Sequence, residues 1–308
     1  VLFMAACSSG GDPTGSTAKA NKTLRGVVNK VSSNSITVNS TTLDASSAQV
    51  TVNGSEGNIT DINPGQVVNV TADMDDDGTG DAIAIEFDND LQGLVLAISV
   101  DGMSLNVMGQ TVTKDDTTRI QGEIKLNSSV EVSGYTTADG SIAASYIEVK
   151  DDTEIEVTGY VKMLTVNADA SGSFMLGLLT VNFSAETLGD LSLAENDYVE
   201  VQSNVSSVTS TDPSAPAMDA ISIELEDEDH GMDGEVDEDT DITGVISSVA
   251  VDGTSVVTSF VIEGLTVFIT DTTEIVAGVV IAVDVGVEVH GTFDVDGAYT
   301  NDNGTTTN

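Results

Sequence analysis

The sequence predicts an all-β protein made of four tandem small β-barrels, and three observations support this fold class. Val, Ile, Thr and Ser dominate the composition, whereas Pro occurs only four times and Trp is absent. Such β-branched enrichment, punctuated by Gly, Asn and Asp, favours strands and turns over helices. Apolar and polar residues also alternate with a period of two, which buries one face of a strand. Finally, a similar unit recurs along the chain, which is typical of tandem domains.

The recurring unit is marked by a glycine inside its first strand. These glycines are Gly26, Gly93, Gly159 and Gly244, at intervals of 67, 66 and 85 residues. Five or six short strands per unit suit a small closed, OB-like barrel, because closure removes exposed sheet edges. A glycine that recurs within a strand predicts a bulge or a sharp bend at that point.

The repeats and their connections predict the following division of the chain. Two insertions lengthen the third interval: a Ser/Thr/Pro-rich loop from Ser206 to Ala217 and an acidic linker, since 10 of the 16 residues from Glu226 to Asp241 are acidic. The expected segments are a signal-peptide remnant with a lipobox (1–7), a flexible tether (8–23), repeat 1 (24–90), repeat 2 (91–154), repeat 3 (155–226), the acidic linker (227–241) and repeat 4 (242–308).

Repeat 2 is the clearest copy of the unit. It begins with L-Q-G-L-V-L-A-I (Leu91–Ile98), continues with S-L-N-V and Q-T-V-T, and contains V-E-V-S-G-Y (Val130–Tyr135) before its last strand, A-S-Y-I-E-V. The alternation predicts that Val130 and Val132 point into the barrel while Glu131 points to solvent.

The pattern G-x-V, s-x-T-V, V-x-V-x-G, D-G and A-x-x-I-E, in this order, resembles a bacterial family known only as a domain of unknown function, family 5666. The resemblance spans about residues 24–299. In that family, tandem small β-barrels occur in exported lipoproteins. The resemblance implies export and a barrel fold, and it implies neither an activity nor catalytic residues.

Repeat 4 departs from the pattern at its end. Where repeat 2 has Ile147–Val149, the corresponding register after Asp296-Gly297 holds Gly304–Thr306, so the apolar closing strand is missing. Three explanations are open: the sequence is cut short, the barrel closes without that strand, or its edge is open to another chain. An open β-edge is a template for strand addition.

The first residues, V-L-F-M-A-A-C-S-S-G-G, resemble the processing box of bacterial lipoproteins, although Met4 stands where a smaller residue is usual. The resemblance implies cleavage before Cys7, lipidation of Cys7 and, because Ser8 follows, an address at the outer membrane. We therefore expect an exported, outer-membrane-anchored lipoprotein on the periplasmic or extracellular face, with membrane lipid as a partner through Cys7. The alternative is a buried or incidental cysteine.

The charge balance is extreme, with 9 basic and 51 acidic residues and a net charge of −42. A field of this sign repels nucleic acid and attracts cations and basic partners. We therefore expect no nucleic-acid partner, and we expect cations, copies of the chain itself or a basic surface as partners. The self-repulsion must be screened, and the screening length is about 8–10 Å near physiological ionic strength.

One acidic turn predicts a calcium site. The stretch D-M-D-D-D-G-T-G-D matches the start of a calcium loop, in which alternate carboxylates converge on one hard cation. Its twelfth position is Ala84 rather than Glu, so the predicted affinity is weak, about 10⁻⁴–10⁻³ M. The alternative is an acidic hairpin turn. The candidate Ca²⁺ ligands are Asp73, Asp75, Asp77, Thr79 and Asp81.

The sequence favours a non-enzymatic role. Its two histidines, His230 in the acidic linker and His290 in a strand, have no nucleophile motif beside them, and we expect His290 at an exposed or rim position. The main hypothesis is a cell-surface or periplasmic structural, adhesive or binding module, stabilised by cations. One alternative is a self-assembling extracellular filament subunit that uses strand addition at repeat 4. Another is a carbohydrate hydrolase, which needs two carboxylates about 5–10 Å apart.

Overall fold

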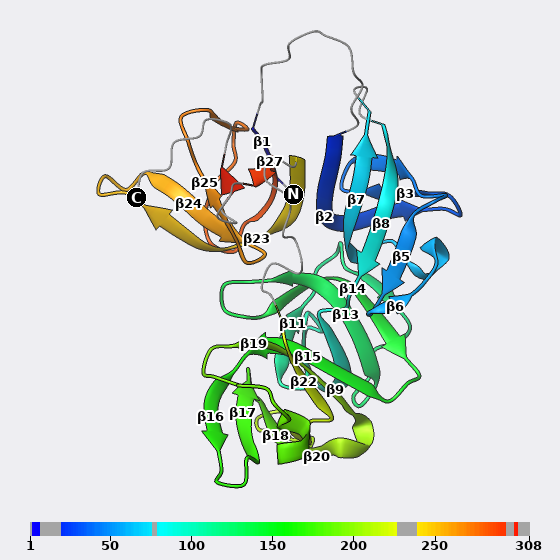
Figure 1. The fold of residues 1–308 in the computed structure, drawn as a ribbon, viewed down its shortest axis with the longest axis vertical. Coiled ribbons are helices and arrows are strands. Elements are labelled where there is room, and N and C mark those ends of the chain that lie inside the picture. Colours follow the sequence, from blue (N-terminus) through cyan, green and yellow to red (C-terminus); the bar gives the residue numbers. More distant parts are fainter. Residues whose placement is uncertain (1, 7–19, 76–78, 227–238, 294–298, 301–308) are drawn as a thin grey trace. The chain divides into compact units, whose positions relative to one another are not determined.

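The computed structural model describes residues 2–6, 20–75, 79–226, 239–293 and 299–300, and it confirms an all-β chain of tandem small barrels (Figure 1). Among these residues, helical structure is limited to α1 (Ala185–Leu188) and two 3-10 turns, η1 (Ile59–Asp61) and η2 (Val205–Ser207). None of the described helices is long and apolar enough to cross a membrane.

The strands of the first two repeats follow the predicted order. Repeat 1 contains β2 (Ala20–Val31), β3 (Ser35–Val38), β4 (Thr41–Asp44), β5 (Gln49–Val52), β6 (Ser55–Glu56), β7 (Val67–Met74) and β8 (Gly80–Phe87). Repeat 2 contains β9 (Leu91–Ile98), β10 (Ser104–Val107), β11 (Gln110–Thr113), β12 (Arg119–Gln121), β13 (Ser129–Thr136) and β14 (Ile142–Lys150).

The remaining repeats use the same plan with local changes. Repeat 3 contains β15 (Glu154–Tyr160), β16 (Lys162–Val166), β17 (Gly172–Leu176), β18 (Leu179–Phe183), β19 (Tyr198–Asn204), β20 (Val208–Ser210), β21 (Ala217–Asp219) and β22 (Ser222–Leu225). Repeat 4 contains β23 (Asp239–Val251), β24 (Val257–Ile262), β25 (Leu265–Phe268), β26 (Thr273–Ile275), β27 (Gly286–Phe293) and β28 (Tyr299–Thr300), and β1 (Leu2–Ala6) pairs with it.

Strand pairing closes the barrel of repeat 1 into a ring. β2 pairs with β3, β3 with β4, β4 with the closing strand β8, β8 with β7, and β7 again with β2. β8 runs antiparallel to β7 and parallel to β4 and β5. Repeat 2 repeats this ring through β9, β10, β11, β14 and β13. Closure satisfies the backbone groups that an open edge would expose.

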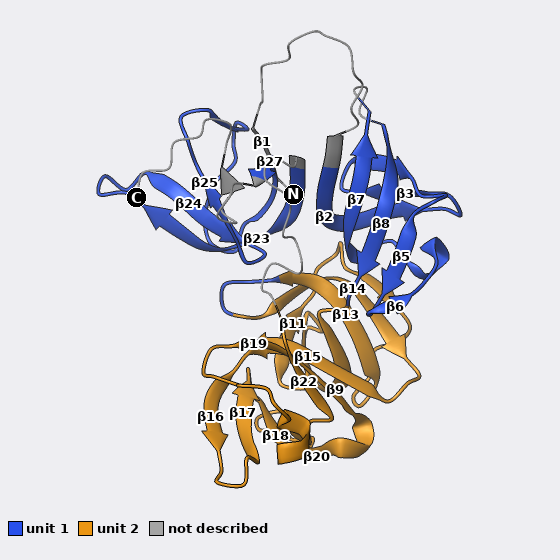
Figure 2. Ribbon diagram, in the orientation of Figure 1, with its two compact units in different colours: residues 1–88, 136–139, 229–308 blue, residues 89–135, 140–228 orange. Residues whose placement is uncertain are grey.

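The repeats group into two compact units that do not follow chain order (Figure 2). Unit 1 comprises residues 1–88, 136–139 and 229–308, and unit 2 comprises residues 89–135 and 140–228. In unit 2, repeats 2 and 3 share one continuous hydrophobic core. In unit 1, repeats 1 and 4 have separate cores and join through the parallel pairing of β2 with β23.

Three of the four marker glycines, Gly26, Gly93 and Gly244, are required for a reason other than the predicted bulge. In repeat 2 a Cβ on Gly93 would lie 2.5 Å from Cγ of Met108, the first residue of the β10–β11 turn. Asn39 lies over Gly26 in the same way, and Glu263 over Gly244. The register shift of β2 falls later, between Val28 and Lys30. Each of these glycines therefore makes room for the side chain of a turn residue.

Two predicted boundaries and one orientation differ from the structure. The tether was expected to extend to residue 23, but β2 begins at Ala20 because it pairs with β7 as far as Met74. The acidic linker was expected to extend to Asp241, but β23 begins at Asp239, where it pairs with β2 and β27. Glu131 was expected to face solvent, but it is 2% exposed, and Lys150 Nζ lies 3.1 Å from its Oε2.

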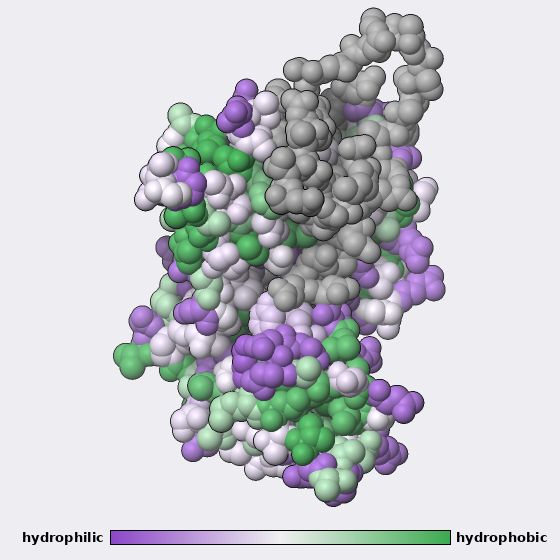
Figure 3. Space-filling view, turned by 60° about the vertical axis from the view of Figure 1, so that its left-hand side comes forward, coloured by the Kyte–Doolittle hydropathy of each residue, from purple (hydrophilic) through white to green (hydrophobic). Residues whose placement is uncertain are grey.

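Exposed apolar side chains occur in both units, and Figure 3 shows hydrophobic residues in patches between hydrophilic ones. In repeat 4 several of them follow β26 along the chain. Ile275 and Val276 are 43% and 45% exposed, and Val280 and Val283 are also exposed.

Candidate functional site

The predicted calcium loop lies at the hairpin between β7 and β8. Asp73, near the end of β7, pairs with Asp81 on β8. The amide of Asp75 donates to the carbonyl of Thr79 at 2.7 Å, which closes the turn. Asp77 lies outside the described residues, as does the lipidation candidate Cys7.

Three of the predicted residues meet in one open pocket. Asp75, Thr79 and Asp81 line a cavity of about 420 Å³ together with residues of the neighbouring β3–β4 hairpin. That hairpin adds a carboxylate that the sequence analysis did not predict, Asp44. Hydrogen bonds from the hydroxyl of Ser46 and then from its amide, at 2.8 Å, hold the pKa of Asp44 below its usual value. The other lining residues are Asn34, Ser35, Thr42, Leu43 and Gly80.

The described residues of the pocket do not by themselves form a metal site. Among the residues that the structure describes, no group of three or more His, Cys, Asp or Glu side chains is arranged to hold a metal ion. Asp73 does not line the pocket. The calcium site therefore stays a prediction, and the arrangement brings together three carboxylates, Asp44, Asp75 and Asp81, from two hairpins.

A second cluster of charges joins repeats 1 and 4. Arg25 on β2 is 5% exposed, and its Nη2 donates to Oε2 of Glu263 at 3.1 Å. Its Nη1 donates to Asn69 at 3.1 Å. Glu263 begins the β24–β25 turn and is 6% exposed. Because both charges are buried, each needs the other as a partner.

The junction continues along β2 and β23. Lys22 Nζ lies 2.8 Å from Oδ2 of Asp241, and Nδ1 of His290 contacts Oδ1 of the same carboxylate. Glu288 is 2% exposed, and its Oε1 lies 3.9 Å from Nε2 of His290. His290 was expected at an exposed or rim position. Its side chain is only partly exposed, with about two-thirds of it covered, and it is bonded to Asp241.

These contacts shift the pKa values of the three titrating groups. The bond with Asp241 raises the pKa of His290 above its usual value against the opposing effect of burial. Burial pushes the pKa of Asp241 upward, but His290 and Lys22 outweigh it and the net pKa is lowered. Burial raises the pKa of Glu288. The junction therefore favours a protonated His290 beside an ionised Asp241.

The junction should weaken as pH rises from about 6 to 8. The pKa of His290 is higher in the folded protein than in the unfolded chain, where it is about 6.5. Protonated His290 therefore contributes its full stabilisation below about pH 6.5, and this stabilisation is lost as pH rises through the pKa of the folded protein. Asp241 loses its contribution only as pH falls through its lowered pKa. We expect the melting temperature of unit 1 to fall by a few degrees over this interval.

Thermal unfolding at both pH values checks this prediction. His290→Gln should remove the pH dependence, whereas His230→Gln, the same change at the other histidine, should retain it. Loss of the pH dependence in both variants, or in neither, would contradict the assignment to His290.

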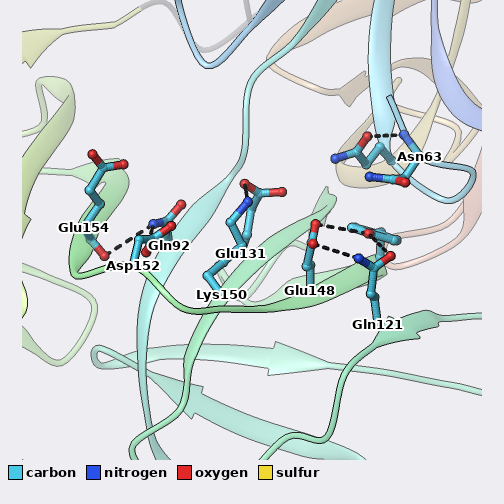
Figure 4. Close-up of polar contacts among 10 residues, drawn as sticks. Asn63, Gln92, Gln121, Glu131, Glu148, Lys150, Asp152 and Glu154 are labelled. Atoms are coloured by element: carbon cyan, nitrogen blue, oxygen red, sulfur yellow. Dashed lines mark hydrogen bonds and ion pairs between the residues drawn. The ribbon is translucent and has the colours of Figure 1, made fainter. Parts of the chain in front are cut away.

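A third group of polar side chains lies on the strands of repeat 2 and beside them (Figure 4). Gln92 donates to Asp152 at 2.8 Å, Glu131 pairs with Lys150, and Gln121 donates to Glu148 at 2.8 Å. Neighbouring strands supply all of these residues except Asp152, which lies between β14 and β15, and Gln92 lies directly opposite Glu131. Such cross-strand pairs stabilise a sheet, and we assign this group a structural role.

Arg25 and Glu263 were not predicted as functional residues. The sequence held one signal for Arg25, because only nine residues of the chain are Lys or Arg. Arg25 also directly precedes the marker glycine Gly26, whereas repeat 2 has the uncharged Gln92 at this position. The partner was not predictable, since 238 residues separate the pair along the chain.

The fold places this chain among proteins made of tandem small β-barrels. The family model for a domain of unknown function (DUF5666) matches residues 25–86, 92–148 and 243–300, which together are more than half of the chain. The chain belongs to this family. Repeat 3 lies outside these matches, although its strands pair in a related order.

Comparison with curated proteins gives no match. Among solved structures, a chain described as drosophila Unr CSD456 is similar at 13% identity. The match covers 66% of this chain and 97% of that chain, with a TM-score of 0.18.

Proposed function

We propose that this protein is an exported, non-enzymatic structural or binding module, anchored through a lipidated Cys7 and stabilised by cations. The pocket of repeat 1 supports the proposal most directly. Its carboxylates Asp44, Asp75 and Asp81 come from two adjacent hairpins, and neutral oxygens of Thr42 and Thr79 lie beside them. Hard cations such as Ca²⁺ take ligands of these types.

The charge of the whole chain supports the same function. A net charge of −42 destabilises a compact state by self-repulsion, and bound or screening cations relieve it. Unit 1 also holds two non-consecutive repeats together, repeats 1 and 4, which suits a module that presents a surface. A second candidate is a self-assembling subunit, since the position beside β27 is filled by a strand from outside repeat 4, and a strand from another copy could take the same place.

Calcium should raise the melting temperature of unit 1 at constant ionic strength. For a site with an affinity of about 10⁻³ M, ten times that concentration stabilises by about 1.4 kcal/mol, because binding to the folded state contributes RT ln(1 + [L]/Kd). This corresponds to a few degrees in a small domain. The measurement is thermal unfolding in calcium and in chelator, with ionic strength matched by NaCl.

The variant Asp75→Asn plus Asp81→Asn should abolish the calcium-dependent shift. The matched control is Asp116→Asn plus Asp190→Asn, which removes the same charge from exposed positions elsewhere. An equal calcium effect in both double variants would assign the shift to general screening and would count against a site in this pocket.

A further inference from the structure

The fourth barrel is closed differently from the first. In repeat 1 the closing strand β8 lies between β7 and β5, antiparallel to β7 and parallel to β5. It contributes Ala82, Ile85 and Phe87 to the core. In repeat 4 the described part of the corresponding strand is β28, which comprises two residues paired with β27 and β25.

The position beside β27 that a full closing strand would occupy is taken by β1. Met4 pairs with Ile275 of β26 and with Val289 of β27, so β1 lies between these two strands. Its direction is opposite to that of a repeat's own closing strand, because β1 is parallel to β27 and antiparallel to β26. The strand therefore comes from outside the repeat, and it reaches the position from the other end of the chain.

The surroundings of this slot suit an apolar strand. Val287 and Val289 of β27 are buried in the core of repeat 4, and they alternate along the strand. Ile275 and Val276 are partly exposed on the other side. The occupying sequence L-F-M-A-A is entirely apolar.

We propose that the slot between β26 and β27 of repeat 4 is a strand-acceptor site, and that Leu2–Ala6 is its occupant in this chain. The backbone of the occupant supplies the affinity through ladder hydrogen bonds to two strands, as in β-strand addition. The inference goes beyond the proposed function and is independent of calcium. If Cys7 is processed as proposed, cleavage before it would detach Leu2–Ala6 and open the slot to an apolar strand in trans.

The full chain carrying Met4→Pro tests the proposal. Proline lacks the amide donor and is excluded from central strands, so the segment should leave the slot. We expect amide hydrogen exchange in Thr273–Ile275 and Val287–His290 to become at least about tenfold faster, because local opening controls exchange. Met4→Val, which keeps the donor and favours strands, is the matched control and should leave exchange unchanged.

A peptide of sequence VLFMAA, added in trans, gives a second measurement. It should bind the Met4→Pro chain and restore slow exchange in β26 and β27. It should not bind the unmodified chain at micromolar concentration, where the tethered segment competes at an effective concentration in the millimolar range. A peptide with Pro in place of its Met should bind neither chain.

Two results would overturn the proposal. Unchanged exchange in Met4→Pro together with no peptide binding would show that the slot holds no strand. Formation of a dimer or larger oligomer by Met4→Pro, with no peptide binding, would assign the slot to a second copy of the chain rather than to Leu2–Ala6.

Discussion

Arg25→Gln should lower the stability of the repeat 1–repeat 4 junction by about 3–5 kcal/mol, because it leaves Glu263 as a buried, uncompensated charge. Both side chains are nearly inaccessible to solvent, so screening by water contributes little. Amide exchange in the paired segments of β2 and β23 measures the effect directly. Where local opening of the strands controls exchange, a loss of 3 kcal/mol in the free energy of opening makes amide exchange more than about a hundredfold faster.

Repeat 2 provides the control for this prediction. Gln92 stands before Gly93 in repeat 2, at the position that Arg25 takes before Gly26 in repeat 1. Met108 begins the β10–β11 turn of repeat 2, and Glu263 begins the equivalent β24–β25 turn of repeat 4. The double variant Arg25→Gln plus Glu263→Met therefore copies residues that the same fold already accommodates. The double variant leaves no uncompensated buried charge at the junction, so most of the stability should return. A double variant as unstable as the single one would contradict the role of the ion pair.

Gly93→Ala should destabilise unit 2 by about 1–3 kcal/mol, because a Cβ at this position overlaps a well-packed side chain. The overlap is with Met108, which is fully buried and has few ways to move aside. Urea unfolding followed by circular dichroism measures the change as a lower midpoint at constant slope.

Repeat 3 contains the matched control for this substitution. Its turn begins with Gly177 instead of a residue that carries a side chain, and a Cβ on Gly159 would be 3.7 Å from its nearest neighbour. Gly159→Ala should therefore change stability by less than about 1 kcal/mol, since the lost flexibility of glycine favours alanine. Equal destabilisation by both substitutions would show that the strand, rather than the turn side chain, requires glycine.

The candidate calcium site was only partly predictable. The alternating aspartates of the β7–β8 turn are a local pattern, and local patterns are visible in sequence. Asp44 joins Asp75 and Asp81 because β4 pairs with β8, and that pairing brings together turns that lie far apart in the chain. His290 was likewise visible as a strand residue, but Asp241 became its partner only through the pairing of β23 with β27.

The sequence by itself determined the all-β class, the repeated barrel unit and the places where repeat 4 departs from it. These features depend on period-two alternation and on turn residues, which act over a few neighbours. The tertiary structure alone decided which repeats share a unit, which charges meet at Arg25 and Glu263, and which strand lies beside β27. Such contacts depend on which sheet edges and buried charges find partners, and a partner can lie anywhere along the chain.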